Sequence, residues 1–268
     1  MSDSLSAPRA TDAPLDNRTG LAFELDGGVA PRAAIGLIVL ATDQTIESEF
    51  RVICDLPGVG LYESRIFNAA QINPETLSQM EAGIAEAAGL ILPGLPLDVV
   101  AYGCTSGAMV IGDETVAARI HEARPGVACT TPMAAAMDAF RALGCRRIAL
   151  LTPYVEEINQ AMRAHLQGGG FQVPAMGSFN EEDDHKAARI TAASVRDAAL
   201  ALGASDEVEA VFVSCTNLRL LDGAARLEAE LGKPVTSSNH ALAWHCLRLA
   251  GIEDSLGEFG SLFTKSLA

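Results

Sequence analysis

The sequence predicts an α/β protein built from two pseudo-symmetric, doubly wound (Rossmann-like) halves, each containing a parallel sheet. Three observations support this prediction. First, the chain has 268 residues, 49% of them hydrophobic, and can bury a sizeable core without disulfide or metal staples. Second, strand-like and helix-like segments alternate, as in parallel sheets covered by helices. Third, their order repeats after about 110 residues, which indicates duplication of one half.

The first half is expected to begin with the apolar run 35–40. This run is rich in β-branched residues, which is typical of a strand buried on both faces. Further strands are expected at 97–102 and 127–130. Helices are expected at 74–88, 113–123 and 132–143, and Gly144 ends the last of these.

The second half is expected to restart with a strand at 147–153, and a further strand is expected at 208–213. The predicted division is a mobile leader at 1–33, a first half at 34–145 to which a C-terminal segment could return, and a second half at 146–268. Helices of the second half are expected at 155–167, 188–202 and 220–231.

The charge and composition exclude several classes of partner. With 19 Lys and Arg against 34 Asp and Glu, the net charge is −15, so nucleic acid and anionic membrane surfaces would be repelled. No uncharged apolar run approaches the roughly 20 residues that a membrane span needs. The first residues show no basic and apolar secretory pattern. We therefore expect a cytoplasmic protein whose six cysteines are reduced.

Two cysteines at the ends of predicted strands are the strongest candidates for catalysis. Cys104 follows the strand 97–102, and Cys215 follows the strand 208–213. Where such a strand turns towards a helix, backbone N–H groups and the helix dipole stabilise a thiolate. If the two halves face each other across a cleft, both turns reach one pocket. The hydroxyl and amide side chains that could hold a carboxylate or an enediolate beside them are Thr105, Ser106, Thr216 and Asn217.

The remaining thiols are expected to be packing residues, because cysteine often behaves as a small buried apolar side chain. Zinc is not expected, since the chain has no close Cys-x-x-Cys or His-x-x-x-His set. No nicotinamide, flavin or pyridoxal motif is evident, so the prediction includes no cofactor and no metal. The four packing cysteines are Cys54, Cys129, Cys145 and Cys246.

Six segments together resemble a known family: Gly36-Leu37-Ile38-Val39, Thr42-Asp43-Gln44-Thr45-Ile46-Glu47, Gly103-Cys104-Thr105-Ser106-Gly107, Leu151-Thr152-Pro153-Tyr154, Ser214-Cys215-Thr216 and Thr236-Ser237-Ser238-Asn239. This layout resembles the aspartate/glutamate racemase superfamily, and within it the branch of maleate cis-trans isomerase and arylmalonate decarboxylase. In that branch it is similar to the ectoine-utilisation protein A group. The similarity spans about residues 33–251.

The resemblance implies an active site between the halves and a mechanism with two thiols. In the isomerase branch the first thiolate, which matches Cys104, attacks or deprotonates the substrate carbon. The second thiol, which matches Cys215, supplies a proton. The decarboxylase branch lacks the first cysteine. Tyr154 matches a tyrosine that hydrogen-bonds a substrate carboxylate. The oxyanion-binding turns match Thr105, Ser106 and Thr216.

Two acidic residues depart from the family pattern. The isomerase branch carries Asn where this chain has Asp43, and a second Asn in the segment that aligns with Asp184. An ionised Asp can only accept hydrogen bonds, so this pair would repel a dicarboxylate and favour a cationic amine or amidinium. We hypothesise a substrate with both a carboxylate and a positive group, such as ectoine or an opened-ring derivative. An alternative for Asp43 is a helix cap for the segment 45–50.

The sequence therefore predicts a cofactor-independent isomerase or racemase that acts at a carbon next to a carboxylate, in the breakdown of ectoine or an amino-acid derivative. One alternative is a decarboxylase or lyase that uses Cys215 alone as proton donor. Another is a small-molecule-binding module, which would also place two α/β halves around a cleft. From the resemblance we expect a homodimer.

Overall fold

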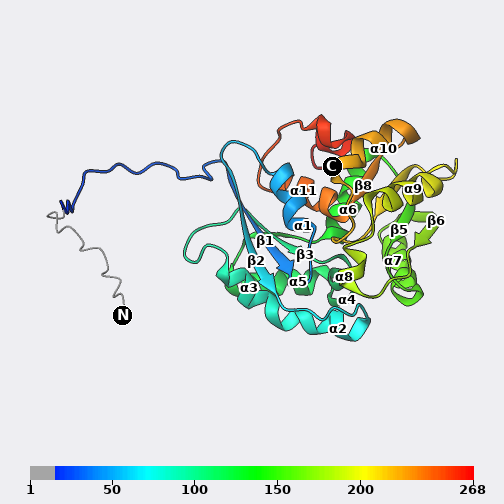
Figure 1. The fold of residues 1–268 in the computed structure, drawn as a ribbon, viewed down its shortest axis with the longest axis horizontal. Coiled ribbons are helices and arrows are strands. Elements are labelled where there is room, and N and C mark those ends of the chain that lie inside the picture. Colours follow the sequence, from blue (N-terminus) through cyan, green and yellow to red (C-terminus); the bar gives the residue numbers. More distant parts are fainter. Residues whose placement is uncertain (1–15) are drawn as a thin grey trace, which may run out of the picture.

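The computed structural model describes residues 16–268, which form two four-stranded sheets in which every strand pair is parallel (Figure 1). The strand order is β2-β1-β3-β4 in the first sheet and β6-β5-β7-β8 in the second. The two orders are equivalent, so the predicted pair of doubly wound α/β halves is confirmed. The strands are β1 (Ala33–Leu40), β2 (Val59–Ile66), β3 (Val99–Gly103), β4 (Ala128–Thr130), β5 (Arg147–Thr152), β6 (Gln172–Ser178), β7 (Ala210–Val213) and β8 (Val235–Ser237).

Helices follow the strands in both halves. In the first half they are α1 (Ile46–Ile53), α2 (Pro74–Gln79), α3 (Ile84–Leu90), α4 (Thr105–Ile111), α5 (Asp113–Ala123) and α6 (Pro132–Leu143). In the second they are α7 (Glu156–Gly168), α8 (Asp184–Ala187), α9 (Ala192–Gly203), α10 (Ala224–Leu231) and α11 (Ser238–Leu249). Short 3-10 turns lie at Met80–Gly83, Leu221–Gly223, Gly257–Phe259 and Ser261–Thr264.

Three predicted helices need correction. The helix predicted at 220–231 begins at Ala224, because the 3-10 turn Leu221–Gly223 precedes α10. The segment 74–88 is not one helix, because the 3-10 turn Met80–Gly83 separates α2 from α3. The helix predicted at 188–202 begins at Ala192, where the Thr191 hydroxyl accepts the Ser194 backbone N–H as an N-cap. By contrast, α5 and α6 have the bounds that the sequence predicts.

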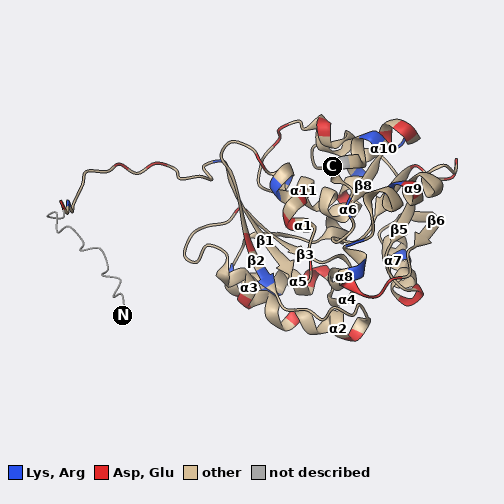
Figure 2. Ribbon diagram, viewed as in Figure 1, with Lys and Arg blue, Asp and Glu red and all other residues tan. Residues whose placement is uncertain are grey.

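The inner strands β1, β3 and β7 are uncharged and buried, and the inner strand β5 carries one charge, Arg147, at its start. The other charged residues lie mainly on outer helices and loops (Figure 2). All eight residues of β1 are buried, as the apolar run predicts for a strand covered on both faces. Of the predicted leader, residues 1–15 lie outside the described part, and residues 16–29 are exposed and carry no helix or strand. No helix within residues 16–268 has the length and apolarity to cross a membrane.

Helices α6 and α11 pack against each other and are exchanged between the halves. Although α6 follows the first sheet, its Phe140 packs edge-to-face against Phe212 of β7 and against Phe171, with ring centroids 5.6 and 5.3 Å apart. Conversely, α11 follows the second sheet but contacts α1 and β3 of the first half. One hydrophobic core therefore runs through both halves and holds them together.

Candidate active site

Four candidate residues follow the two inner strands of each sheet. Asp43 follows β1 and Cys104 follows β3, while Tyr154 follows β5 and Cys215 follows β7. Between β1 and β3, and between β5 and β7, the strand order reverses, which makes each pair the topological switch point of its sheet. In doubly wound folds, ligands bind outside the carboxyl ends of the strands at this point. The topology therefore places equivalent residues of the two halves at equivalent positions.

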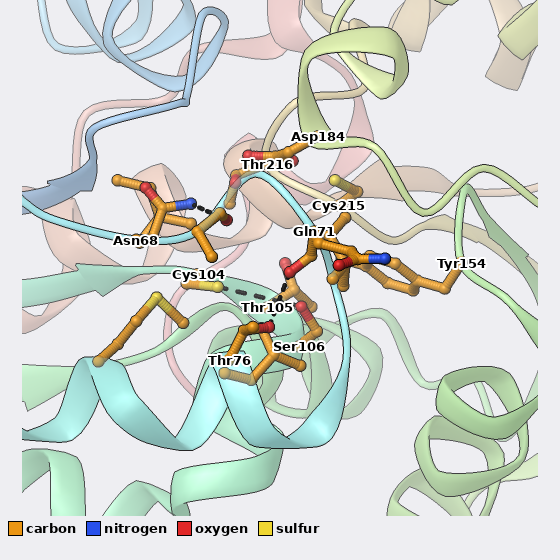
Figure 3. A pocket seen from close by; sticks show the side chains of 15 residues that line it. Asn68, Gln71, Thr76, Cys104, Thr105, Ser106, Tyr154, Asp184, Cys215 and Thr216 are labelled. Carbon is orange, nitrogen blue, oxygen red and sulfur yellow. Dashed lines mark hydrogen bonds between the residues drawn. The ribbon is translucent and has the colours of Figure 1, made fainter.

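A small cavity lies between these strand ends (Figure 3). Its volume is about 20 Å³, which is room for about one water molecule. Both Cys104 and Cys215 line it, as the duplication predicts. The other predicted site residues in its wall are Thr105, Ser106, Tyr154, Asp184 and Thr216.

Each cysteine sulfur accepts a backbone N–H from the turn that follows it. Gly107 N lies 3.2 Å from Cys104 Sγ, and Asn217 N lies 3.4 Å from Cys215 Sγ. Both thiols are only 4% exposed. The predicted contact between strand-end amides and the sulfur atoms is therefore present in both halves.

The turn amides lower the thiol pKa values in the predicted direction, but the effect of burial is larger. Burial raises the pKa of Cys104 to about 12, and it raises the pKa of Cys215 well above its usual value. The amide hydrogen bonds lower both pKa values, but the loss of hydration and the negative charge of Asp184 outweigh them. Without a ligand, both thiols are protonated at neutral pH.

Tyr154 is a neutral hydrogen-bond donor in this site. Its side chain is 2% exposed, and burial raises the pKa of its hydroxyl well above the usual value. The hydroxyl lies close to Cys215 and Ser106, and its hydrogen bond lowers the pKa of Cys215. A phenol in this position can donate to a carboxylate, as the resemblance implies.

Asp43 caps the first turn of α1, which was the structural alternative for this residue. One carboxylate oxygen, Oδ1, accepts the N–H groups of Thr45 and Ile46, each at 2.8 Å. The other oxygen, Oδ2, is buried and has no partner of good hydrogen-bond geometry among the described residues. Burial raises the pKa of Asp43 to about 6, although the two amides and the Thr216 hydroxyl act against the shift. The helix cap therefore uses only one of the two carboxylate oxygens of Asp43.

Asp184 begins α8 and enters the cavity from the second half (Figure 3). It is 5% exposed and accepts a hydrogen bond from the Thr42 hydroxyl in the loop after β1. Thr42 Oγ1 in turn accepts Asn68 Nδ2 at 2.7 Å. This chain of hydrogen bonds joins the two halves beside the thiols.

Two predicted site residues connect the halves through their side chains. The Thr105 hydroxyl donates to Ser238 Oγ at 2.8 Å, and Ser238 Oγ also accepts Cys215 N at 3.0 Å. Asn217 Oδ1 accepts Gln44 N at 2.9 Å and does not line the cavity. These contacts fix the relative position of the two cysteine turns.

The sequence analysis missed the segment that covers the cavity. Residues 68–80 contribute Asn68, Gln71 and Thr76 to its wall, and an antiparallel bridge pairs Gln71 with Asp183 of the opposite half. Backbone hydrogen bonds from Ile72 N to Glu182 O and from Asp184 N to Ala70 O complete this contact. The signal that could have revealed it is Asn73-Pro74, which marks a helix start shortly after the unpredicted strand β2.

Two exchanged α/β halves with matched cysteines at their inner strand ends define an Asp/Glu racemase-like fold. The sequence profile of the arylmalonate decarboxylase family matches residues 68–263, so the chain belongs to this family. An arylmalonate decarboxylase from Bordetella bronchiseptica is 34% identical over 127 residues, which are 47% of this chain and 53% of the relative. A maleate isomerase from Nocardia farcinica is 27% identical over 247 residues, which cover 87% of this chain and 96% of the isomerase.

Solved structures agree with this assignment. A cysteine-to-serine mutant of the Nocardia farcinica maleate cis-trans isomerase, with a covalently bound succinylcysteine intermediate, superimposes with a TM-score of 0.79 at 25% identity. The match covers 87% of this chain and 98% of that one. A liganded double mutant of arylmalonate decarboxylase gives a TM-score of 0.72 at 28% identity, over 82% and 93% of the two chains. The fold and the relatives are those of enzymes.

Proposed function

We propose that this protein is a cofactor-independent isomerase or racemase that acts at a carbon next to a carboxylate through Cys104 and Cys215. The observation that carries the proposal is that the two thiols, at equivalent strand ends of the two halves, line one small cavity. The Tyr154 hydroxyl and the hydroxyls of Ser106 and Thr216 line the same cavity and are suited to hold the substrate carboxylate.

The proposed reaction transfers one proton between two faces of the carbon. One cysteine thiolate removes the proton from the carbon next to the carboxylate, and the electron pair moves into an enediolate held by the hydroxyl donors. The opposite thiol then delivers its proton to the other face and becomes the thiolate. For a substrate with a double bond, the thiolate instead adds to carbon, and rotation about the resulting single bond precedes its expulsion. The succinylcysteine intermediate of the related isomerase supports this second form.

Enantiomer interconversion and deuterium uptake from D2O test this proposal on a panel of small chiral carboxylic acids. We expect Cys104→Ala and Cys215→Ala each to lower interconversion by at least about 100-fold, because one of the two proton carriers is lost. Each variant should exchange the proton of at most one enantiomer. Cys129→Ala, outside the cavity, is the matched control and should keep full activity. Near-complete interconversion by either site variant would contradict the proposal.

The second candidate is a decarboxylase that uses Cys215 alone, which the family assignment favours. This enzyme would release CO2 from a malonate derivative and would remain active as Cys104→Ala. The presence of a thiol at position 104 favours the isomerase, because the decarboxylation needs only one proton donor. A role in ectoine breakdown, a homodimeric state and a cytoplasmic location stay predictions from the sequence.

A further inference from the structure

Among the described residues, the cavity is bordered by one carboxylate and two thiols but by no basic side chain, and Asp43 lies behind its wall. Of the described residues that line it, Asp184 is a carboxylate, and none is Lys, Arg or His. A second carboxylate, Asp43, is buried beside it against Thr216 and is close enough to Asp184 for their charges to repel. A substrate therefore enters a site of strongly negative potential.

Basic side chains next to the two site carboxylates in sequence or space are engaged elsewhere. Arg65 Nη1 donates to the backbone carbonyl of Asp43 at 3.2 Å, but its guanidinium pairs with the Glu47 carboxylate. His185 is exposed and lies 3.4 Å from Gln44 Nε2. In the described part of the chain, neither of the two site carboxylates forms a salt bridge.

The site also has more acceptors than donors. Asp43 is 3% exposed, and its Oδ2 has no donor of good hydrogen-bond geometry among the described residues, although the Thr216 hydroxyl lies close to the carboxylate. A buried carboxylate oxygen without a well-placed donor destabilises the folded protein. Asp184 receives one hydroxyl hydrogen bond from Thr42. A ligand that brings N–H donors can fill this deficit, whereas a ligand carboxylate brings only further acceptors.

The same two carboxylates act against the chemistry of the thiols. Both Asp43 and Asp184 raise the pKa values of Cys104 and Cys215, and burial raises them further. The thiolate is the reactive form, so the free site suppresses the species that the proposed function requires. A positive charge bound beside the carboxylates lowers the thiol pKa values, and a second negative charge raises them.

We propose that the substrate carries a positively charged nitrogen group, an ammonium or amidinium, in addition to the carboxylate at the reacting carbon. Asp43 and Asp184 hold this group, and its charge permits one thiol to ionise. In this step a thiol S–H loses its proton to solvent as the cation enters, and the positive group compensates the charge of the new thiolate beside the two carboxylates. This inference rests on the proposed function, since it assigns the substrate class to the same site.

A matched pair of ligands tests the inference by isothermal titration calorimetry at pH 8. The probes are 3-amidinopropionate and succinate, which have nearly the same shape. Each carries one carboxylate, and the planar group at the other end is a positively charged amidinium in the first and a second carboxylate in the other. We expect the amidinium ligand to bind the wild type at least about tenfold more tightly, because close charge pairs couple strongly. Its binding should also release a proton, seen as a heat that depends on the ionisation enthalpy of the buffer.

Single substitutions assign the selectivity to the two carboxylates. Asp43→Asn and Asp184→Asn are each expected to reduce the preference for 3-amidinopropionate by at least about tenfold. Asp183→Asn is the matched control, because this neighbouring side chain caps α8 through Lys186 N and does not line the cavity. Succinate binding as tightly as 3-amidinopropionate, no binding of 3-amidinopropionate, or an unchanged preference in both site variants would overturn the inference.

The outcome can be separated from that of the proposed function. The preference for the cationic ligand is measured by binding alone, so we expect it to persist in Cys104→Ala and Cys215→Ala. The proton release on binding is expected to fall in the variant that lacks the ionising thiol. If succinate is preferred while both thiols prove essential for interconversion, only the substrate class is wrong. If the cation is preferred while neither thiol affects turnover, only the two-thiol mechanism is wrong.

Discussion

Replacing Asp43 by Asn is expected to stabilise the protein at neutral pH. Burial raises the pKa of this carboxyl from 3.8 to about 6, so the folded protein binds this proton more tightly than the unfolded chain does. Above pH 6 the folded protein must therefore hold a poorly hydrated charge. A difference of about two pKa units corresponds to about 3 kcal/mol of lost stability.

The sign of the effect fixes its pH dependence. Below about pH 4 the carboxyl is protonated in both states, so the substitution should change the free energy of unfolding little. Between pH 4 and pH 6 the advantage of Asn should grow, and above pH 7 it should stay near about 3 kcal/mol. For a chain of this size that corresponds to a rise in Tm of about 6–12 °C.

Denaturant unfolding at intervals from pH 4 to pH 8 measures this directly. The Asn side chain keeps an oxygen for the Thr45 and Ile46 N–H groups and places an NH2 where the unpartnered oxygen lies. The exposed Asp206→Asn is the matched control and should show no difference. An Asp43→Asn variant that is less stable than wild type at pH 8, or equally altered at pH 4 and pH 8, would refute the reasoning.

Three further predictions concern the fold and the site. Burial lowers the pKa of His240 to about 4. The free energy of unfolding should therefore fall by about 3 kcal/mol as the pH drops from 6.5 to 4, because the unfolded chain binds this proton first. In denaturant unfolding, the His240→Asn variant should not show this loss. Phe140→Ala should cost about 3–5 kcal/mol of unfolding free energy, because it empties the contact between α6 and the second sheet, whereas the exposed Phe67→Ala should cost little. Gly107→Ala should lower kcat on the order of 100-fold with unchanged circular dichroism, because the added Cβ would lie 2.8 Å from Cys104 Sγ; full activity would show that the sulfur position is not critical.

The inner strands and the duplication were predictable because their signals are local and strong. An uncharged apolar run such as β1 indicates a strand that is buried on both faces. The repeated order of strands and helices can be seen in the sequence without any knowledge of tertiary contacts. The edge strands β2 and β6 escaped prediction because they are partly exposed and mix polar residues with Gly or Pro. The return of a C-terminal segment to the first half was raised from the sequence, but the packing of α6 on the second sheet was not, since periodicity does not indicate which sheet a helix covers.

At the site, chemistry that depends on sequence neighbours was predictable and chemistry that depends on burial was not. The amide contacts of Cys104 and Cys215 follow from their place at strand ends. The raised thiol pKa values follow from the burial of the two side chains and from Asp184, which lies far away in sequence. The hydroxyl contact between Thr105 and Ser238 likewise requires the two halves to be in place.

Duplication and divergence together explain how one site can hold two chemically different ends of a substrate. The equivalent strand ends after β3 and β7 carry the same thiol, and in the proposed mechanism this pair would place a proton carrier on each side of the reacting carbon. The equivalent ends after β1 and β5 diverged, so that Asp43 is an acceptor and Tyr154 a donor. The retained pair is symmetric, as proton transfer between two faces requires. The diverged pair is asymmetric, and this asymmetry would orient a substrate with its positive group towards Asp43 and its carboxylate towards Tyr154.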